Sequence, residues 1–135
     1  GVRSFGPLRA SLGVDTAALE AAADVYVMIE TARGLAALDE ICAVPGLTGV
    51  YVGPADLAIS MGHRLADVWT HPDIRAAMAE IAATAAAAGL ITGIHAGTGT
   101  LGKAMAESGF RMITLTSESQ ALRRGAAAHL SEAQS

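Results

Sequence analysis

The stretch Leu47-Thr-Gly-Val-Tyr-Val-Gly-Pro-Ala-Asp56 joins a short apolar run to a glycine–proline turn that carries an acidic residue. A run of about four to eight apolar and β-branched residues bounded by turn residues is typical of a strand buried in a parallel sheet. Pro54 restricts the backbone and stiffens the turn. The stretch therefore predicts a strand over residues 47–52, a tight turn over residues 53–56 and a short helical segment after it.

On both sides of this stretch, apolar runs alternate with helix-prone segments. Residues 1–9 and 63–70 are predicted to be loops, and the run at 25–29 is expected to be buried on both faces of a sheet. The remaining strands are predicted at 25–29, 90–95 and 110–115, and the helices at 17–23, 31–43, 72–88, 97–108 and 118–130.

Strands that alternate with helices four times over indicate a parallel α/β sheet with right-handed crossovers. Two architectures fit this order. One is an open doubly wound sheet. The other is part of a (β/α)₈ barrel, which needs about 250 residues when complete.

The amino-acid composition limits which classes of protein and which partners are expected. The 135 residues are 52% hydrophobic with a net charge of −4, which indicates one folded domain over residues 1–135. The basic residues form no stripe, so nucleic acid is not an expected partner. We expect no membrane association, because no apolar run reaches the roughly 18 residues of a membrane span. Cys42 is the only cysteine, so we expect an inert buried thiol in a reducing compartment, the cytoplasm.

Polar residues follow the predicted strands at the point where each strand ends. Glu30 follows the first strand, Asp56 the second and His95 the third. Because the carboxyl ends of parallel strands meet at one edge, Glu30 and Asp56 should face the same mouth, where two carboxylates can hold Mg²⁺ or Mn²⁺. Both residues also precede helices, so a pair of first-turn acids explains the spacing equally well.

Other residues near the strand ends carry weaker signals. The turn from Gly53 to Asp56 should point backbone N–H groups at a bound carboxylate, although an ordinary strand-to-helix turn has the same composition. His95 could contact a substrate at the mouth or form hydrogen bonds within its own loop. Lys103 is the only lysine and lies inside a helix, which excludes an imine-forming site in this chain. The remaining histidines, to which we assign no role, are His63, His71 and His129.

Several motifs keep order and spacing over much of the chain. They are Met28-Ile-Glu-Thr31, Leu38-Asp-Glu-Ile41, Val44-Pro-Gly-Leu47, Gly49-Val-Tyr-Val-Gly-Pro-Ala-Asp-Leu57 and Ser60-Met-Gly62. This series resembles the class II, metal-dependent 2-oxo-acid aldolases, which include the 4-hydroxy-2-oxoheptanedioate aldolases. The resemblance implies a TIM (β/α)₈ barrel in which residues 1–135 supply about the fifth to eighth strands, the C-terminal half.

The resemblance also implies an activity and a site. Glu30 and Asp56 match the family's metal ligands, with Mg²⁺, Mn²⁺ or Co²⁺ as the ion, and the turn formed by Gly53, Pro54, Ala55 and Asp56 would hold the substrate carboxylate. The expected reaction is carbon–carbon cleavage of 4-hydroxy-2-oxo acids to pyruvate and an aldehyde. The bound ion would act as a Lewis acid. A homo-oligomer is expected.

Two residues depart from the family pattern. Met28 stands where many members have a substrate-contacting glutamine, and Ala55 stands where many have serine. The family's histidine–aspartate base and keto-binding arginine come from earlier strands, so no catalytic residue is expected in this half, and Arg3 is not assigned that role. A chain that begins at Gly1 should lack normal activity unless another polypeptide completes it, and its unpaired sheet edges favour self-association.

Three alternatives accompany the aldolase interpretation. Gly97-Thr-Gly-Thr-Leu-Gly102 fits the dinucleotide fingerprint G-x-G-x-x-G, with Glu118 sixteen residues beyond it, although glycines in a tight barrel turn explain it too. A catalytically inactive half-barrel remnant is the second alternative. The third is the related lyase branch that acts on citramalyl- or malyl-thioesters.

Overall fold

Four parallel strands form the centre of the molecule in the computed structural model, which describes residues 15–135. Each strand pairs in parallel with its neighbour in sequence, in the order β1-β2-β3-β4. The four predicted strands and their parallel arrangement are confirmed, whereas the predicted loop at residues 1–9 lies outside the described residues. The strand bounds are β1 (Tyr26–Ile29), β2 (Gly49–Val52), β3 (Ile91–His95) and β4 (Met112–Thr114).

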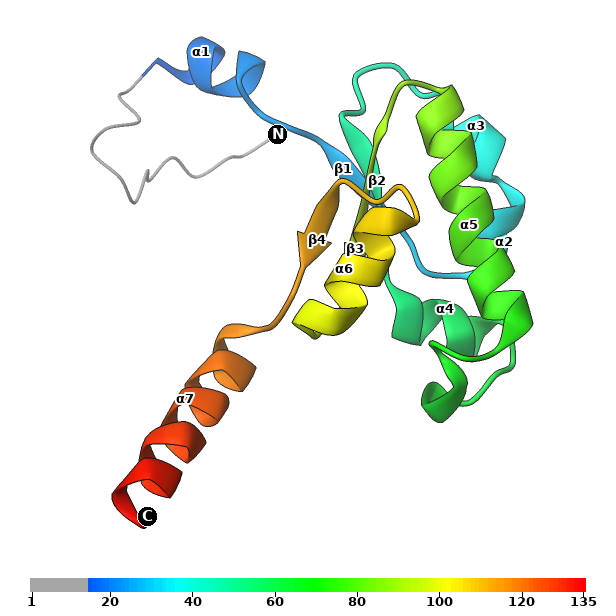
Figure 1. Ribbon diagram of the computed structural model, residues 1–135. Helices are drawn as coiled ribbons and strands as arrows, with labels where there is room; N and C mark the ends of the chain where they lie inside the picture. The colour runs from blue at the N-terminus through cyan, green and yellow to red at the C-terminus, as the bar shows by residue number, and fades with distance from the viewer. Residues whose placement is uncertain (1–14) are drawn as a thin grey trace.

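Helices fill every connection between the strands (Figure 1). None of the described helices is both long and apolar enough to cross a membrane. In chain order they are α1 (Thr16–Ala21), α2 (Ala32–Ala36), α3 (Leu38–Cys42), α4 (Pro54–Ser60), the 3₁₀ helix η2 (Leu65–Asp67), α5 (Pro72–Ala87), α6 (Gly99–Glu107) and α7 (Glu118–Ala133).

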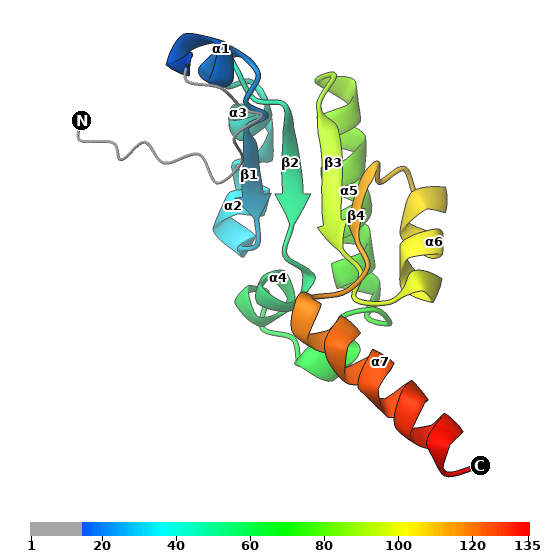
Figure 2. The same ribbon diagram turned by 90° about the vertical axis from the view of Figure 1, so that its left-hand side faces the viewer.

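One face of the sheet carries the hydrophobic core. Figures 1 and 2 show α2, α3, α5 and α6 arranged along the same side of the curved sheet. The strand side chains directed at these helices are almost fully buried, among them Ile29, Val52 and Ile94, which are paired across β1, β2 and β3. A parallel sheet covered by its crossover helices on one side is the arrangement that right-handed connections produce.

No helix layer formed by residues 15–135 covers the opposite face of the sheet (Figure 2). Met28 is 55% exposed and Met112 is 42% exposed, although both lie within strands. The prediction that the run at 25–29 is buried on both faces is therefore wrong for the described residues. An apolar run shows that a strand avoids water, but the elements that cover its second face can lie elsewhere in sequence or in another chain.

Tyr51 links three strands on this open face. Its register partner is Gly93, and a methyl group at Gly93 would lie 2.5 Å from the Tyr51 ring, so the ring lies over the glycine. The Tyr51 hydroxyl then donates a hydrogen bond of 2.8 Å to Thr114 Oγ1 on β4. The missing side chain at Gly93 thus allows one tyrosine to span β2, β3 and β4.

The helix predicted over residues 31–43 is interrupted. The structure has α2 and α3 in its place, separated by Ala37 with φ −100° and ψ 15°, outside helical values. Gly34 in the middle of α2 weakens the segment as a helix. The break divides the segment into a partly buried turn around Leu35 and a second turn in which Leu38 and Cys42 are buried.

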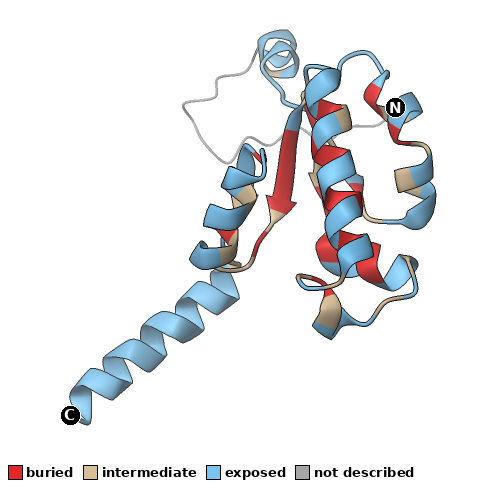
Figure 3. Ribbon diagram, turned by 45° about the vertical axis from the view of Figure 1, so that its right-hand side comes forward, coloured by how far each residue is buried: buried red, intermediate tan, exposed pale blue. Residues whose placement is uncertain are grey.

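The long helix α5 and the C-terminal helix α7 differ in packing. α5 buries Ile74, Ile81 and three alanines along one stripe that faces the core. It ends at Ala87 and is followed by Gly89, whose φ of +73° favours glycine. By contrast, α7 has no buried residue. Its ribbon is pale blue along its length in Figure 3 and projects away from the sheet.

Cys42 is a buried free thiol at the end of α3, as predicted. Burial raises the pKa of the Cys42 thiol, and the negative charge of Asp39 raises it further. A raised pKa lowers the thiolate fraction near neutral pH, and the thiolate is the nucleophile. Cys42 therefore contributes to packing.

We expect Ile81→Ala to destabilise the fold by about 2–5 kcal/mol, because Ile81 is 0% exposed on the buried side of α5 and truncation leaves a cavity. Urea unfolding followed by circular dichroism measures the change. Val44→Ala is the matched control, since Val44 is 50% exposed and its truncation should cost less than about 0.5 kcal/mol. Equal losses for the two variants would contradict the assigned core.

Candidate metal and substrate site

The register of β1 and β2 brings the two predicted acidic segments to one edge of the sheet. Ile29 pairs with Val52, so Glu30 and Gly53 are the first residues beyond two adjacent strands. The backbone continues this contact, because the Gly53 N–H donates to the Ile29 carbonyl at 3.3 Å. Glu30 is half-buried there.

Glu30 lies directly against Gly53. A methyl group at Gly53 would lie 3.0 Å from both the Cβ and the Oε2 of Glu30, and 3.5 Å from the sulfur of Met28. Contacts that short are rare for real side chains, so the glycine leaves the space that the glutamate occupies. The Glu30 carboxylate therefore sits over the residue that caps α4.

Asp56 lies in the first turn of α4 and is exposed. Gly53 is the N-cap, provides no side-chain hydrogen bond, and is followed by Pro54 at the first helical position. The first hydrogen bond within α4 is donated by Leu57, so the N–H groups of Ala55 and Asp56 have no partner among residues 15–135. They are the kind of helix-terminal donors that bind anions.

A side-chain hydrogen bond joins the loop after Glu30 to α4. The Ala32 N–H at the start of α2 donates to Ser60 Oγ at the end of α4, with a distance of 3.0 Å. Ser60 thus holds together the two segments that carry Glu30 and Asp56. The structure places these predicted residues on neighbouring elements at the same edge.

His95 shares a cavity with the turn before Asp56. The cavity has a volume of about 250 Å³ and opens at the strand ends. A larger hollow of about 540 Å³ lies between α5 and α6 and contains none of the predicted site residues. The smaller cavity is lined by Pro54, Ala55, Leu65, Val68, Trp69, His95, Ala96 and Gly97. His95 and Ala55 are therefore brought together, as the position of His95 at a strand end predicts.

The glycines of the G-x-G-x-x-G motif have structural roles. Gly97 has a φ of +73° in the turn after β3. A methyl group at Gly102 would lie 2.2 Å from a methyl carbon of Leu115, so this glycine lets α6 pack on the last strand. The strand order β1-β2-β3-β4 contains no reversal at which a dinucleotide site forms. The dinucleotide alternative receives no support.

A group of side chains that sequence reasoning missed lies beside the cavity. His63, His71 and Asp73 place ligand atoms within 4.8 Å of one another. The only sequence signal for this group is a histidine at each end of one loop, which does not show that the loop brings the two rings together.

Comparison with known proteins identifies the family to which the chain belongs. The sequence profile described as HpcH/HpaI aldolase/citrate lyase matches residues 9–124, most of the chain. The chain belongs to the HpcH/HpaI aldolase/citrate lyase family. The resemblance recognised in the motifs around Glu30 and Asp56 is thereby confirmed.

Relatives of this chain include proteins named as aldolases. The hydroxypyruvate/pyruvate aldolase of Rhizorhabdus wittichii is 38% identical over 117 residues, which cover 84% of this chain and 47% of that protein. The 4-hydroxy-2-oxo-heptane-1,7-dioate aldolase of Klebsiella pneumoniae is 36% identical over 104 residues, covering 77% of this chain and 38% of that protein. The chain thus spans about half the length, or less, of the relatives it matches.

Solved structures of the HpcH/HpaI family share the fold. A family protein from Burkholderia cenocepacia has a TM-score of 0.81 and 36% identity, with 100% of this chain and 54% of that one covered. The citrate lyase beta subunit from M. tuberculosis, complexed with oxaloacetate and magnesium, has a TM-score of 0.60 and 27% identity, with 76% and 51% covered.

We expect Gly53→Ala to weaken Mn²⁺ binding on the order of tenfold, which corresponds to about 1.4 kcal/mol. The added methyl group must displace Glu30, whereas the Gly53 φ of −96° suits alanine, so the fold should persist. Isothermal titration calorimetry with MnCl₂ measures the affinity. Gly99→Ala is the control, because a methyl group there meets nothing within 4 Å. Unchanged affinity in Gly53→Ala would contradict a role for Glu30 in holding the ion.

Proposed function

We propose that this chain forms part of a metal-dependent aldolase that cleaves 4-hydroxy-2-oxo acids to pyruvate and an aldehyde. The family, and the aldolase names of relatives that match most of the chain, support this reaction class. The observation that carries the proposal is the placement of the Glu30 carboxylate over Gly53, one strand away from Asp56 in the first turn of α4.

Glu30 and Asp56 are proposed to hold a divalent ion, Mg²⁺ or Mn²⁺, with Co²⁺ as a further candidate. Carboxylate oxygens are hard ligands that suit these ions, and two of them leave positions for water and substrate oxygens. The space left by Gly53 is what lets the first of these carboxylates reach the α4 terminus. A magnesium complex of one structural neighbour supports the choice of a hard ion. When bound, the ion supplies Lewis-acid stabilisation of negative charge on the keto oxygen.

The α4 terminus is proposed to bind the substrate carboxylate. The N–H groups of Ala55 and Asp56 are available for it, Pro54 stiffens the turn, and Gly53 keeps the approach open. His95 would contact the part of the substrate that enters the cavity it shares with Ala55. Because Ala55 has no hydroxyl, this contact relies on the backbone.

Residues 1–135 are proposed to form the C-terminal half of a (β/α)₈ barrel. The strands follow one another in sequence, helices cover one face, and side chains such as Met28 and Met112 line the uncovered face. In a closed barrel that face points into the interior. The base and the keto-binding arginine would then come from strands that precede Tyr26, so no catalytic residue is assigned to the described strands.

A homo-oligomer is the proposed assembly, with α7 as a contact element. Leu122 is 75% exposed and Leu130 is 62% exposed, and the two lie on the same side of α7. A helix that projects from the body with an apolar side open to water gains stability by packing against a second copy.

Glu30→Gln and Asp56→Asn each test the metal site. We expect either change to weaken Mn²⁺ binding by at least about 100-fold, because loss of a ligand exceeds the 10- to 100-fold cost of outer-shell changes. Any pyruvate released from 4-hydroxy-2-oxo acids once the site is complete, measured with lactate dehydrogenase and NADH, should depend on Mn²⁺ and disappear in both variants. Glu118→Gln is the matched control, since Glu118 also lies in a first helical turn after a strand.

The outcomes separate the competing interpretations. Metal binding without turnover would show that the chain carries the metal site and needs a second polypeptide to complete it. No metal binding, together with a monomeric fold, would favour an inactive half-barrel. Turnover of a citramalyl- or malyl-thioester in place of the free acid would move the chain to the related lyase branch.

The double variant Leu122→Ser/Leu130→Ser should shift the protein towards monomer in sedimentation equilibrium, since both serines replace exposed apolar contacts on α7. Ala128→Ser, on the opposite side of the helix, is the control and should leave the assembly unchanged. A monomeric unsubstituted chain at all concentrations would contradict the proposed assembly.

A further inference from the structure

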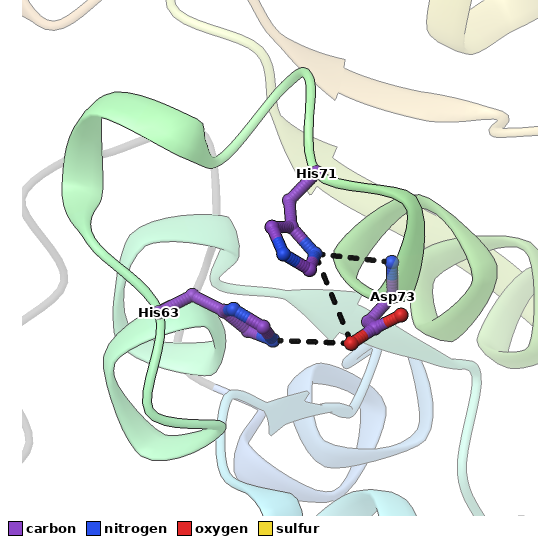
Figure 4. A group of neighbouring side chains, drawn as sticks. All are labelled: His63, His71 and Asp73. Carbon is purple, nitrogen blue, oxygen red and sulfur yellow. Dashed lines mark hydrogen bonds and ion pairs between the residues drawn. The ribbon is translucent and has the colours of Figure 1, made fainter.

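Two imidazoles and a carboxylate converge at the start of α5 (Figure 4). His63 Nε2 lies 3.6 Å from Asp73 Oδ2, and His71 Nδ1 lies 3.8 Å from the same oxygen. The two rings face each other with centroids 3.9 Å apart and an interplanar angle of 40°. All three residues therefore direct a potential ligand atom into one small volume.

We infer that His63, His71 and Asp73 bind a divalent transition-metal ion of the Zn²⁺ class, separate from the ion proposed at Glu30 and Asp56. Imidazole nitrogens with a carboxylate oxygen form a donor set that suits Zn²⁺ and disfavours Mg²⁺. Ligand atoms around tetrahedral Zn²⁺ lie about 3.3 Å apart when the bonds are about 2.0–2.1 Å long. The two nitrogen–oxygen separations of 3.6 and 3.8 Å need only a small contraction, all three ligand atoms lie within 4.8 Å of one another, and water would fill the open position.

Backbone hydrogen bonds hold both histidines in place before any ion arrives. The His63 N–H donates to the Ala58 carbonyl at 2.9 Å, and the His71 N–H donates to the Asp67 carbonyl at 2.8 Å. The His63 side chain is 19% exposed and that of His71 is 34% exposed, so neither ring is free in solvent. The backbone of both histidines is thus fixed, which reduces the conformational freedom lost on binding.

His71 already presents an unprotonated nitrogen to Asp73. Its Nδ1 accepts a hydrogen bond of 3.3 Å from the Asp73 N–H, which requires a lone pair at Nδ1. A hydrogen bond of this length is at the weak end of the range, so an ion can displace it at small cost. Asp73 is 65% exposed, which leaves its carboxylate accessible for entry of an ion.

The ion would clamp the loop that forms one wall of the substrate cavity. His63 and His71 bracket residues 64–70, and three side chains of that segment line the 250 Å³ cavity beside His95: Leu65, Val68 and Trp69. One ion held by both ends of the loop would restrict the segment between them. We therefore assign the site a structural role in ordering the cavity wall.

Calorimetric titration with ZnCl₂ tests the site in the full chain carrying Glu30→Gln and Asp56→Asn, which removes the carboxylate site. One equivalent of Zn²⁺ should bind in a non-coordinating buffer at about pH 7.5, because the ligands must be deprotonated. Adding His63→Gln or Asp73→Asn should weaken binding at least about 100-fold. Mg²⁺ should give no signal at this site.

The matched control is His129→Gln. His129 Nδ1 lies 3.6 Å from Glu132 Oε2 on the exposed surface of α7, without a third ligand in the described part of the chain. Zn²⁺ affinity should be unchanged in this variant. Absence of Zn²⁺ binding in the background protein, or equal affinity in His63→Gln and Asp73→Asn, would overturn the proposal and leave an ion pair beside a helix cap.

Two further readouts need no folding-sensitive variant. Co²⁺ bound in place of Zn²⁺ should give the strong visible absorption of a four-coordinate ion, whereas the weak spectrum of hydrated Co²⁺ would overturn the proposal. Zn²⁺ should also change the fluorescence of Trp69, the only tryptophan, and slow trypsin cleavage after Arg64, whose side chain is 79% exposed. These results do not depend on pyruvate release, so the aldolase proposal can fail while this site stands.

Discussion

The close approach of β1 and β2 at Glu30 and Gly53 governs the chemistry available at the strand ends. Parallel pairing in this register puts the glutamate beside the N-cap of α4, where a residue without a side chain leaves room for it. The same glycine begins the turn that sets the direction of α4 and therefore the position of Asp56. A single steric requirement thus couples an acidic side chain, a helix terminus and a second acidic residue.

The loop between α4 and α5 follows the helix that carries Asp56 and is bounded by His63 and His71. On the cavity side it presents apolar side chains such as Val68 and Trp69, and at its ends it presents imidazoles. The carboxylates at Glu30 and Asp56 suit a hard ion, whereas His63 and His71 suit a softer one. In the two proposed sites, the difference in ligand type would direct each kind of ion to its own site.

Much of this architecture follows from the amino-acid sequence. Apolar runs located all four strands, glycines such as Gly89 marked helix ends, and strand order placed Glu30 and Asp56 at one edge. The break at Ala37 was not predictable, because Gly34 weakens a helix without ending it and no turn residue stands at position 37. The exposure of Met28 was not predicted, because an apolar side chain can pack against a helix layer or in the interior of a barrel, and the sequence does not distinguish the two.

The convergence of His63 and His71 lies beyond sequence periodicity, since it depends on the path of an irregular loop. The order of the strands also affects how the sheet forms during folding. Because every strand pairs with its immediate neighbour in sequence, the contacts that build the sheet have modest sequence separation for a β structure, and each crossover helix closes its own loop. Because the entropy lost on closing a loop grows with loop length, pairing between neighbours in sequence costs less than pairing between distant strands would. The sheet can therefore grow one β–α unit at a time as the chain leaves the ribosome.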